Sequence, residues 1–283
     1  MREFPIIEPI DYLLIGHVTQ DVIPGGFSLG GTASYSALTA RAMGMRVGVV
    51  TACHPELELP ELEGISVARY PSEFSTTFAN IQTPAGRVQY LYQRAQELEV
   101  AMIPDTWRDA PIVHLGPVAQ EVNVKLARAF SNSFVGLTPQ GWMRGWDENG
   151  KVGYSDWLEA RYVLEAADAA VISIEDVRGD ESIIEDIISS IRVLVVTEGS
   201  SGARLYWNGD YRYYRAPAEA EIDPTGSGDI FAAAFFIRME YTHDPWEAAR
   251  FATQIAAKSV TRKGLAGVPT SEEIKANLVE VLE

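Results

Sequence analysis

The chain has 283 residues, of which 47% are hydrophobic and 22% charged, enough for one large domain or two small ones. Its net charge of −16 argues against a surface for nucleic acid or anionic membranes, because both need clustered lysine and arginine. No apolar run approaches the ~18 residues of a membrane span, and residues 1–5 lack the cationic start of a signal peptide. We therefore expect a cytoplasmic protein with no nucleic-acid and no membrane partner.

Short apolar runs alternate with helical stretches along most of the chain. The runs predict buried strands at 12–16, 47–51, 112–115, 134–137, 169–172 and 193–197. Helices are predicted between them at 30–44, 119–130, 156–166 and 181–191. Strands alternating with helices imply an α/β fold, a doubly wound and mostly parallel sheet flanked by helices. In such sheets ligands bind beyond the carboxyl ends of the strands.

The segment 72–99 interrupts this alternation. Residues 76–83 and 87–93 are rich in Thr, Tyr and Val and flank Pro84-Ala-Gly86, which is the pattern of a β-hairpin. We predict a small β lid, formed by 17–29 and 72–99 within a single domain spanning 1–283. The lid is expected to close over the substrate and exclude water.

The segment Asp223-Pro-Thr-Gly-Ser-Gly-Asp229 leads straight into an apolar, alanine-rich helix. Glycine lets the backbone curl tightly, and the free N–H groups of Gly226, Ser227 and Gly228 at the helix start favour an anion. Asp229, at the same helix start, could accept a hydroxyl proton during phosphoryl transfer. A capping carboxylate in a glycine-rich turn is an equally good interpretation of the local sequence.

This segment resembles the C-terminal signature of the ribokinase-like carbohydrate kinases (the PfkB family), Asp-Thr-x-Gly-Ala-Gly-Asp followed by an apolar helix. The resemblance implies that Asp229 is the catalytic base, with Gly226, Ser227 and Gly228 as the anion hole. It therefore favours catalysis over capping, and it implies a ribokinase-like fold. The implied cofactors are ATP and Mg2+, and a K+ ion near Asp223 is left open.

Three further segments match the family in chain order. Gly30 and Gly31 open a stretch that resembles the N-terminal signature, in which a diglycine approaches the sugar hydroxyls. The segment 196–203 resembles one that touches the nucleotide, and 256–264 resembles the helix and loop that border the adenine pocket. The implied nucleotide-binding residues are Thr197, Gly199 and Gly202.

Two departures from the family pattern fall in these motifs. Tyr35 stands where family members commonly have an asparagine that binds the sugar, so we place it in an altered substrate pocket. The usual Asn-x-x-Glu appears as Ser173-Ile-Glu-Asp176. Ser173 keeps a hydroxyl near the nucleotide, and Asp176 keeps a carboxylate that could hold magnesium through water.

Asp21 follows the first strand, where family members place an aspartate that binds substrate hydroxyls. A carboxylate can accept two hydrogen bonds from a vicinal diol. Short matches, among them Arg94 and Gln140-Gly-Trp-Met-Arg144, resemble the archaeal inositol-kinase branch. The predicted acceptor is therefore myo-inositol or a related cyclitol, in a polyol pocket lined by Asp21, Arg94 and Gln140.

Other functions stay open at this point. A nucleoside, ribose, fructose or ketodeoxygluconate kinase is the alternative enzyme. A non-catalytic regulator that binds sugar or nucleotide is favoured only by the altered Asn-x-x-Glu motif. The sequence does not give the acceptor hydroxyl or the oligomeric state. In some family members the lid supplies a dimer contact, so the resemblance leaves a homodimer open.

Overall fold

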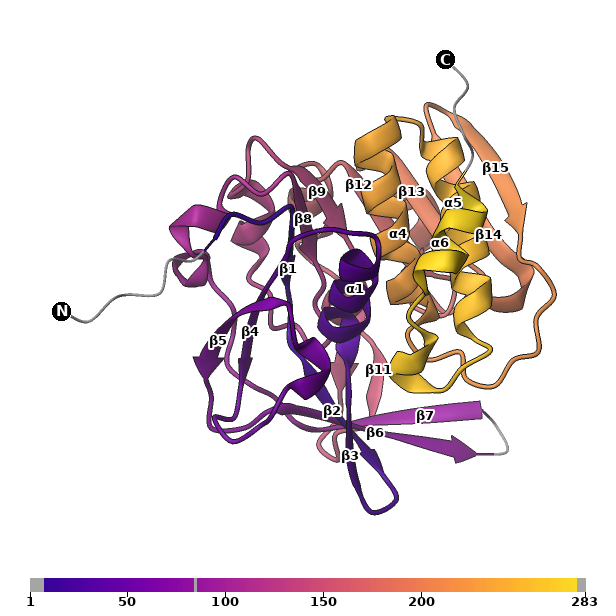
Figure 1. The fold of residues 1–283 in the computed structure, drawn as a ribbon. Helices are drawn as coiled ribbons and strands as arrows, with labels where there is room; N and C mark the ends of the chain where they lie inside the picture. The colour runs from indigo at the N-terminus through magenta and orange to yellow at the C-terminus, as the bar shows by residue number, and fades with distance from the viewer. Residues whose placement is uncertain (1–7, 84–85, 279–283) are drawn as a thin grey trace.

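The computed structural model describes residues 8–83 and 86–278 (Figure 1). The strands are β1 (Tyr12–Ile15), β2 (Thr19–Ile23), β3 (Gly26–Gly30), β4 (Val47–Cys53), β5 (Ser66–Pro71), β6 (Thr76–Thr83), β7 (Gly86–Gln93), β8 (Ile112–Leu115), β9 (Phe134–Leu137), β10 (Arg144–Trp146), β11 (Val152–Tyr154), β12 (Ala169–Ser173), β13 (Val193–Thr197), β14 (Gly202–Trp207) and β15 (Asp210–Arg215). The α-helices are α1 (Gly31–Ala42), α2 (Ala160–Leu164), α3 (Glu181–Ile188), α4 (Ser227–Thr242), α5 (Pro245–Ser259) and α6 (Ser271–Asn277).

A nine-stranded sheet forms the body, in the order β15-β14-β13-β12-β9-β8-β1-β4-β5. Neighbouring strands from β5 to β13 pair in parallel, and β14 and β15 continue the sheet as an antiparallel hairpin. The central strands are continuous apolar runs because both of their faces are covered. The predicted mostly parallel, doubly wound sheet is confirmed.

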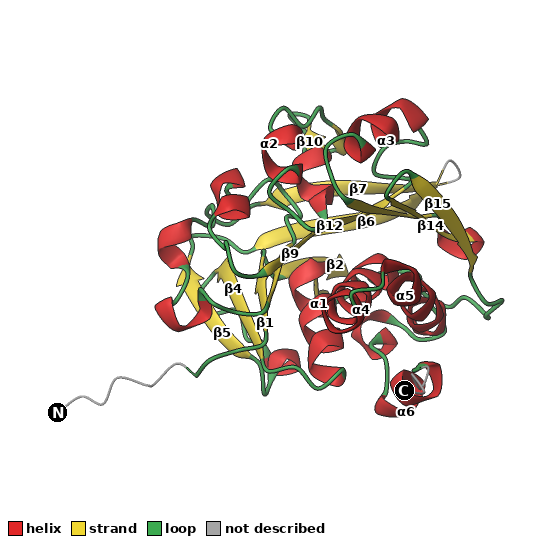
Figure 2. Cartoon of the chain, turned by 90° about the horizontal axis from the view of Figure 1, so that it is seen from above, coloured by secondary structure: helices red, strands yellow, loops and turns green. Residues whose placement is uncertain are grey.

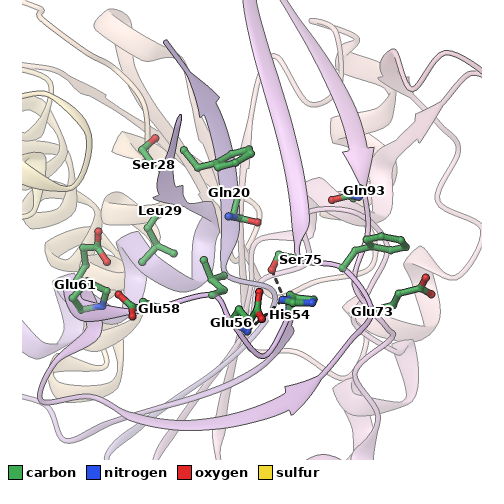
Figure 3. A pocket seen from close by; sticks show the side chains of 14 residues that line it. Gln20, Ser28, Leu29, His54, Glu56, Glu58, Glu61, Glu73, Ser75 and Gln93 are labelled. Atoms are coloured by element: carbon green, nitrogen blue, oxygen red, sulfur yellow. Dashed lines mark hydrogen bonds between the residues drawn. The ribbon is translucent and has the colours of Figure 1, made fainter. Parts of the chain in front are cut away.

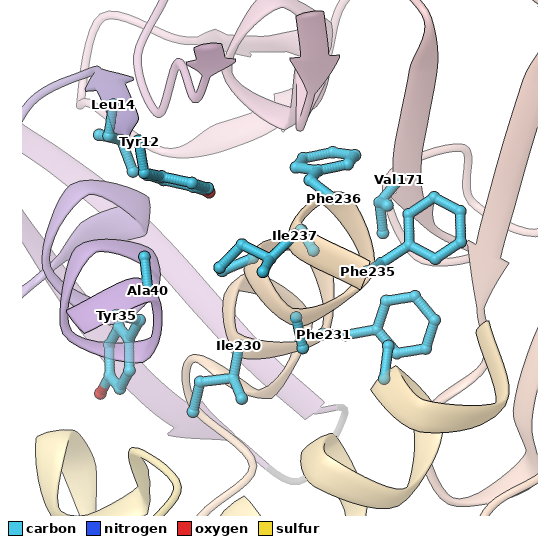
Figure 4. Close-up of a cluster of buried hydrophobic side chains, with 14 of the residues drawn as sticks. Tyr12, Leu14, Tyr35, Ala40, Val171, Ile230, Phe231, Phe235, Phe236 and Ile237 are labelled. Carbon is cyan, nitrogen blue, oxygen red and sulfur yellow. The ribbon is translucent and has the colours of Figure 1, made fainter. Parts of the chain in front are cut away.

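Helices cover both faces of the sheet (Figure 2). One hydrophobic cluster packs α1, α4 and α5 against one face, and a second lies on the other face beneath α2 and α3. Helix α4 is the centre of the first cluster, where its side chains meet those of β1, β12 and α1 (Figure 4). No helix in the described part of the chain is long and apolar enough to cross a membrane.

A four-stranded sheet, in the order β3-β2-β6-β7, projects from the body at the lower edge of Figure 1 and is the predicted β lid. Strands β2 and β6 pair in parallel, and the other two pairs are antiparallel. Pro84 and Ala85 of the predicted turn lie outside the described residues. The β10–β11 hairpin supports the lid, because the Leu91 N–H donates to the Gly150 carbonyl at 2.8 Å.

The prediction of a helix over 119–130 is wrong. The chain instead turns sharply at Gln120, whose φ is +58°, and Glu121 is fully buried. The Glu121 carboxylate accepts hydrogen bonds from the N–H groups of Val118 and Ala119, which closes the turn. Only a short 3-10 helix, Val124–Arg128, follows it. A buried carboxylate thus overrides the helical pattern.

Candidate active site

Helix α4 presents an N-terminus that no side chain caps. Residues 230–237 of this helix are buried without interruption, so apolar neighbours hold it on all sides. The N–H groups of a first helical turn have no partner inside the helix, and together with the macrodipole they favour a negative charge. The first turn of α4 is therefore rigidly held, and its N–H groups favour a negative charge.

The residues before this helix shape the turn. Gly226 has a φ of +80°, and a Cβ there would overlap the ring of Tyr35, so only glycine fits. A Cβ on Gly228 would meet no atom within 4 Å, so the space in front of the helix start is open. The Ser227 N–H donates to the Pro224 carbonyl at 3.2 Å. Of the three predicted anion-hole residues, Gly228 faces open space, whereas Gly226 and Ser227 build the turn.

Asp223 ties this loop to the segment after α5. Its carboxylate accepts the Thr225 N–H at 3.0 Å and the Gly264 N–H at 2.9 Å. Burial acts to raise the pKa of Asp223, but these hydrogen bonds and the nearby Lys263 outweigh it and lower the pKa. Asp223 is thus an ionised anchor of the loop.

Asp229 lies half-buried in the first turn of α4. The Thr32 hydroxyl donates to its Oδ1 atom at 2.6 Å, and Thr32 also lies against Gly116, the residue after β8. Burial raises the pKa of Asp229 to about 6, opposed by the Thr32 hydrogen bond and Arg144 and assisted by two neighbouring carboxylates. A carboxylate with a pKa just below neutral suits a general base.

Asp21 approaches the same site from the lid, on β2. A Cβ on Gly30 would overlap the Asp21 carboxylate, and Gly31 has a φ of +83°, so both glycines are needed for the close approach. The charge of Asp21 contributes to the raised pKa of Asp229. The structure thus brings together Asp21, Gly30 and Asp229, which come from the lid, the start of α1 and the start of α4.

Arg144 is a site residue that the sequence analysis missed. It begins β10, donates to the Val118 carbonyl at 3.1 Å, and places its guanidinium 5.8 Å from the centre of the Phe78 ring in the lid. Its positive charge lowers the pKa of both Asp229 and Asp176. It was one of the residues in the 140–144 match, so the signal was present, but only Gln140 was selected from it.

Gln140, Ser173 and Asp176 form one hydrogen-bonded group. The Gln140 side-chain amide donates to Asp176 Oδ1 at 2.9 Å, and the Ser173 N–H donates to Oδ2 at 2.8 Å. Burial raises the pKa of Asp176. The side-chain amide of Gln140 is therefore already hydrogen-bonded to Asp176, so it can contact an acceptor only together with Asp176.

The donor set fits a magnesium ion only in part. Within residues 8–83 and 86–278, no group of three or more His, Cys, Asp or Glu side chains could hold a metal. Magnesium commonly needs only one or two carboxylates, with substrate phosphates and water completing the shell. Asp176 has one such carboxylate, whose oxygens keep a lone pair each beyond the two hydrogen bonds. These residues therefore fit a magnesium ion that is bound to the phosphates of the donor and held by Asp176 through water.

The predicted nucleotide segment lies at the turn between β13 and β14. The Thr197 hydroxyl donates to the Ile172 carbonyl at 3.2 Å. A Cβ on Gly202 would overlap the Tyr214 carbonyl, so this glycine is required by the hairpin itself. Gly199 has a φ of +58° and open space around it. Gly199 thus differs from Gly202, because the space beside its backbone is open.

Of the two remaining predicted substrate-binding residues, Tyr35 lies within electrostatic reach of Asp21 and Asp229, whereas Arg94 lies at the base of the lid. Arg94 is exposed at the base of the lid and donates to the Gln120 carbonyl at 2.7 Å. Tyr35 is buried, its ring covers Gly226, and burial raises its pKa. Tyr35 therefore supports the loop before α4 from the side of α1.

A cavity of about 740 Å³ lies on the other side of the lid (Figure 3). It is bounded by strands β2 and β3 and by the segment 54–61. Gln20 lines it, whereas Asp21 is not among the residues that line it.

Comparison with known proteins connects this geometry to a family. The model of the pfkB family carbohydrate kinases matches residues 164–272. A cytidine kinase from Thermococcus kodakarensis is 24% identical over 254 residues, covering 80% of this chain and 87% of that protein. An inositol 3-kinase from Zea mays is 26% identical over 226 residues, covering 78% of this chain but only 56% of the maize protein.

Solved structures show the same fold. A pyrophosphate-dependent kinase in the ribokinase family, complexed with a pyrophosphate analog and myo-inositol, has a TM-score of 0.79 at 21% identity and covers 94% of this chain and 99% of its own. A ribokinase from Arabidopsis thaliana, complexed with ribose and ATP, has a TM-score of 0.73 at 17% identity, with coverages of 95% and 98%. The fold is ribokinase-like, and the chain is a phosphotransferase. Within this fold, residues 164–272 are the part that matches the pfkB family of carbohydrate kinases.

Proposed function

We propose that this kinase transfers the γ-phosphoryl group of ATP to a hydroxyl of a small uncharged polyol, with myo-inositol or a related cyclitol as the first candidate. The observation that carries the proposal is the arrangement around Asp229. Its carboxylate has a pKa raised to about 6 and lies at an uncapped helix start, with open space in front of Gly228.

In the proposed reaction, Asp229 accepts the proton of the attacking hydroxyl as its oxygen bonds to the γ-phosphorus. The bond from that phosphorus to the bridging oxygen breaks, and ADP leaves with the electron pair. The first-turn N–H groups of α4 stabilise the charge on the transferring group. Magnesium, held through Asp176, would neutralise charge on the donor phosphates.

The charges in the site support an uncharged acceptor. Asp21 and Asp176 each lie within electrostatic reach of Asp229, and Arg144 is a cation that acts on both Asp176 and Asp229. Three carboxylates against one guanidinium disfavour an acceptor that already carries a phosphate. They suit a polyol, whose hydroxyl groups donate hydrogen bonds to carboxylates.

A nucleoside is the second candidate acceptor. The cytidine kinase from Thermococcus kodakarensis aligns with most of its own length, and the maize inositol kinase aligns with about half.

An acceptor screen tests the proposal. Purified protein is mixed with magnesium and ATP, or with magnesium and pyrophosphate, and phosphorylated product is measured for myo-inositol, other cyclitols, cytidine, ribose, fructose, ketodeoxygluconate and ribose 1-phosphate. We expect the highest kcat/KM with a cyclitol and ATP, over a no-acceptor control. Preference for cytidine would favour the second candidate, and preference for ribose 1-phosphate would overturn the uncharged-acceptor proposal. If ligands bind but no acceptor is ever phosphorylated, the kinase proposal fails.

We also propose a homodimer joined through the lid. Apolar side chains on the lid strands are exposed, including Val22, Ile23, Phe27 and Ile81. Large exposed apolar patches often mark association sites. Light scattering of the purified protein should give twice the chain mass, and a monomer at micromolar concentration would contradict this.

A further inference from the structure

The chain passes between body and lid four times, and all four crossings meet at His17. The crossings lie between β1 and β2, between β3 and α1, before β6, and after β7. His17 belongs to the first crossing and is fully buried. Its carbonyl oxygen would lie 2.9 Å from a Cβ on Gly31, so the second crossing packs directly against it.

The imidazole ring joins the remaining two crossings. Its Nε2 atom lies 2.8 Å from the Gln96 carbonyl, after β7, and its Nδ1 atom lies 2.7 Å from the Thr76 hydroxyl, at the start of β6. A carbonyl can only accept, so Nε2 carries the hydrogen. Burial lowers the pKa of His17, so the ring is neutral and Nδ1 accepts from Thr76.

Neighbouring groups complete the arrangement. The Thr76 hydroxyl oxygen also accepts the Ala95 N–H at 3.0 Å, which links the third crossing to the fourth. The His17 N–H donates to the buried Glu121 carboxylate at 3.0 Å, and the Val18 N–H donates to the Thr51 hydroxyl at 2.9 Å. The base of the lid is therefore fixed to the body by hydrogen bonds among largely buried groups.

We propose that His17 is a positioning residue, which fixes the base of the lid and thereby holds Asp21 at the correct separation from Asp229. The inference rests on the proposed function, in which Asp21 binds the acceptor and Asp229 activates it. Asp21 is on β2, only four residues after His17. A displacement of the His17 ring would therefore also displace Asp21. A misplacement of about 1 Å in such a pair can cost up to 10²-fold in rate.

The kinetic test uses paired substitutions. His17→Phe keeps an aromatic ring but removes both ring hydrogen bonds, and Thr76→Val removes the hydroxyl that the ring contacts. Each should raise the acceptor KM by roughly tenfold while the donor KM changes by less than about twofold. Because the lid would admit water, hydrolysis of ATP without acceptor should also rise.

Two further variants separate positioning from general destabilisation. His17→Gln keeps a side-chain N–H that can donate to the Gln96 carbonyl, so it should recover part of the acceptor affinity. Thr77→Val is the matched control, because the Thr77 hydroxyl donates only to the nearby Ser75 carbonyl. It should leave both KM values unchanged. Equal rises in donor and acceptor KM in Thr76→Val would overturn the proposal.

A final measurement needs no substrate, and so separates this inference from the proposed function. Hydrogen exchange should accelerate in β2 and β6 in Thr76→Val, while exchange in β12, β13 and α4 stays as in the wild type. Wild-type protection of the lid strands would refute the positioning role even if the kinase is active. If the wild type phosphorylates no acceptor but the lid exchanges faster in Thr76→Val, the proposed function fails and the structural role of His17 stands.

Discussion

Two parts of the chain meet at the candidate active site, and the family model matches only one of them. Residues 164–272 match the pfkB family model and contain the loop 223–229, Asp229 and the start of α4. Asp21, Arg144 and the whole lid lie outside that match. In the proposed function, the C-terminal part supplies the base and the helix start for phosphoryl transfer, and the N-terminal part supplies groups that bind the acceptor. The contrast suggests that transfer chemistry and acceptor choice are separable, which substitutions on each side can test.

The largest effect is expected from the C-terminal side. Asp229→Asn removes the proposed base, so kcat should fall about a thousandfold with every acceptor, while both KM values change little. Asp210→Asn, at an exposed position on β15, serves as the control and should retain full activity. Substantial turnover by Asp229→Asn would disprove the assignment of the base.

The N-terminal counterpart should change acceptor binding alone. Asp21→Asn loses charge-assisted hydrogen bonds, so the acceptor KM should rise roughly 10- to 100-fold while the ATP KM stays constant. Glu73→Gln, which lines the cavity of Figure 3, is the matched control on the lid. An equal loss of ATP affinity in Asp21→Asn would contradict the division between the two parts of the chain.

Gly226 precedes α4 and Gly228 lies in its first turn, so the two glycines allow stability and donor binding to be compared within the C-terminal part. Gly226→Ala places a methyl group against Tyr35 at a positive φ, so the free energy of unfolding should fall by about 1–3 kcal/mol. Gly228→Ala meets open space and should leave stability within about 0.5 kcal/mol. It should instead raise the ATP KM. Urea unfolding and initial-rate kinetics together check the pair, and an unchanged ATP KM would remove Gly228 from the donor site.

The pH dependence should give the smallest effects. Because Asp229 must be ionised to act as a base, kcat/KM should fall below pH 6. The hydrogen bond from Thr32 lowers the pKa of Asp229, so Thr32→Val should move this acid limb upward, by up to about one pH unit. An acid limb that stays in place in Thr32→Val would show that another group controls it.

The same group makes a prediction about stability, with a definite sign. The pKa of Asp229 rises from an ordinary value of 3.8 to about 6 on folding. The folded state therefore binds more protons between these values, and stability falls as pH rises through that window. Asp229→Asn removes the penalty, so the variant should melt higher than the wild type at pH 7, and the difference should shrink towards pH 4. An equal difference at both pH values would contradict the raised pKa.

Much of the fold follows from local sequence, but its edges do not. The central strands are almost entirely apolar, and this predicted them correctly. Strands β5, β14 and β15 were not predicted. β5 and β15 are the two edges of the sheet, where polar and mixed sequences such as Asp210–Arg215 are tolerated, and β14 is the neighbour of β15 in the same hairpin. The helix predicted over 119–130 does not form, because the Glu121 carboxylate accepts hydrogen bonds from Val118 and Ala119 and closes a buried turn. The spacing of apolar residues gives no sign of such a turn.

The candidate site shows the same limit. Asp229 and Gly226 could be identified because their whole motif is contiguous. Thr32 donates to Asp229 across 197 positions in the sequence, and Arg144 reaches the lid only because the β10–β11 hairpin folds back towards β7. Contacts of this kind depend on how distant elements pack. A sequence pattern could place Thr32 and Arg144 in segments near the site, but it could not tell which residues they contact.

The complete burial of residues 230–237 has a consequence for how the enzyme fails on heating. A helix that forms the centre of the core cannot fray separately from it, so Asp229 keeps its place until the whole body melts. Thermal inactivation and cooperative unfolding should therefore share one midpoint. A lid that loosens earlier would weaken acceptor binding before that temperature, without damaging the catalytic group.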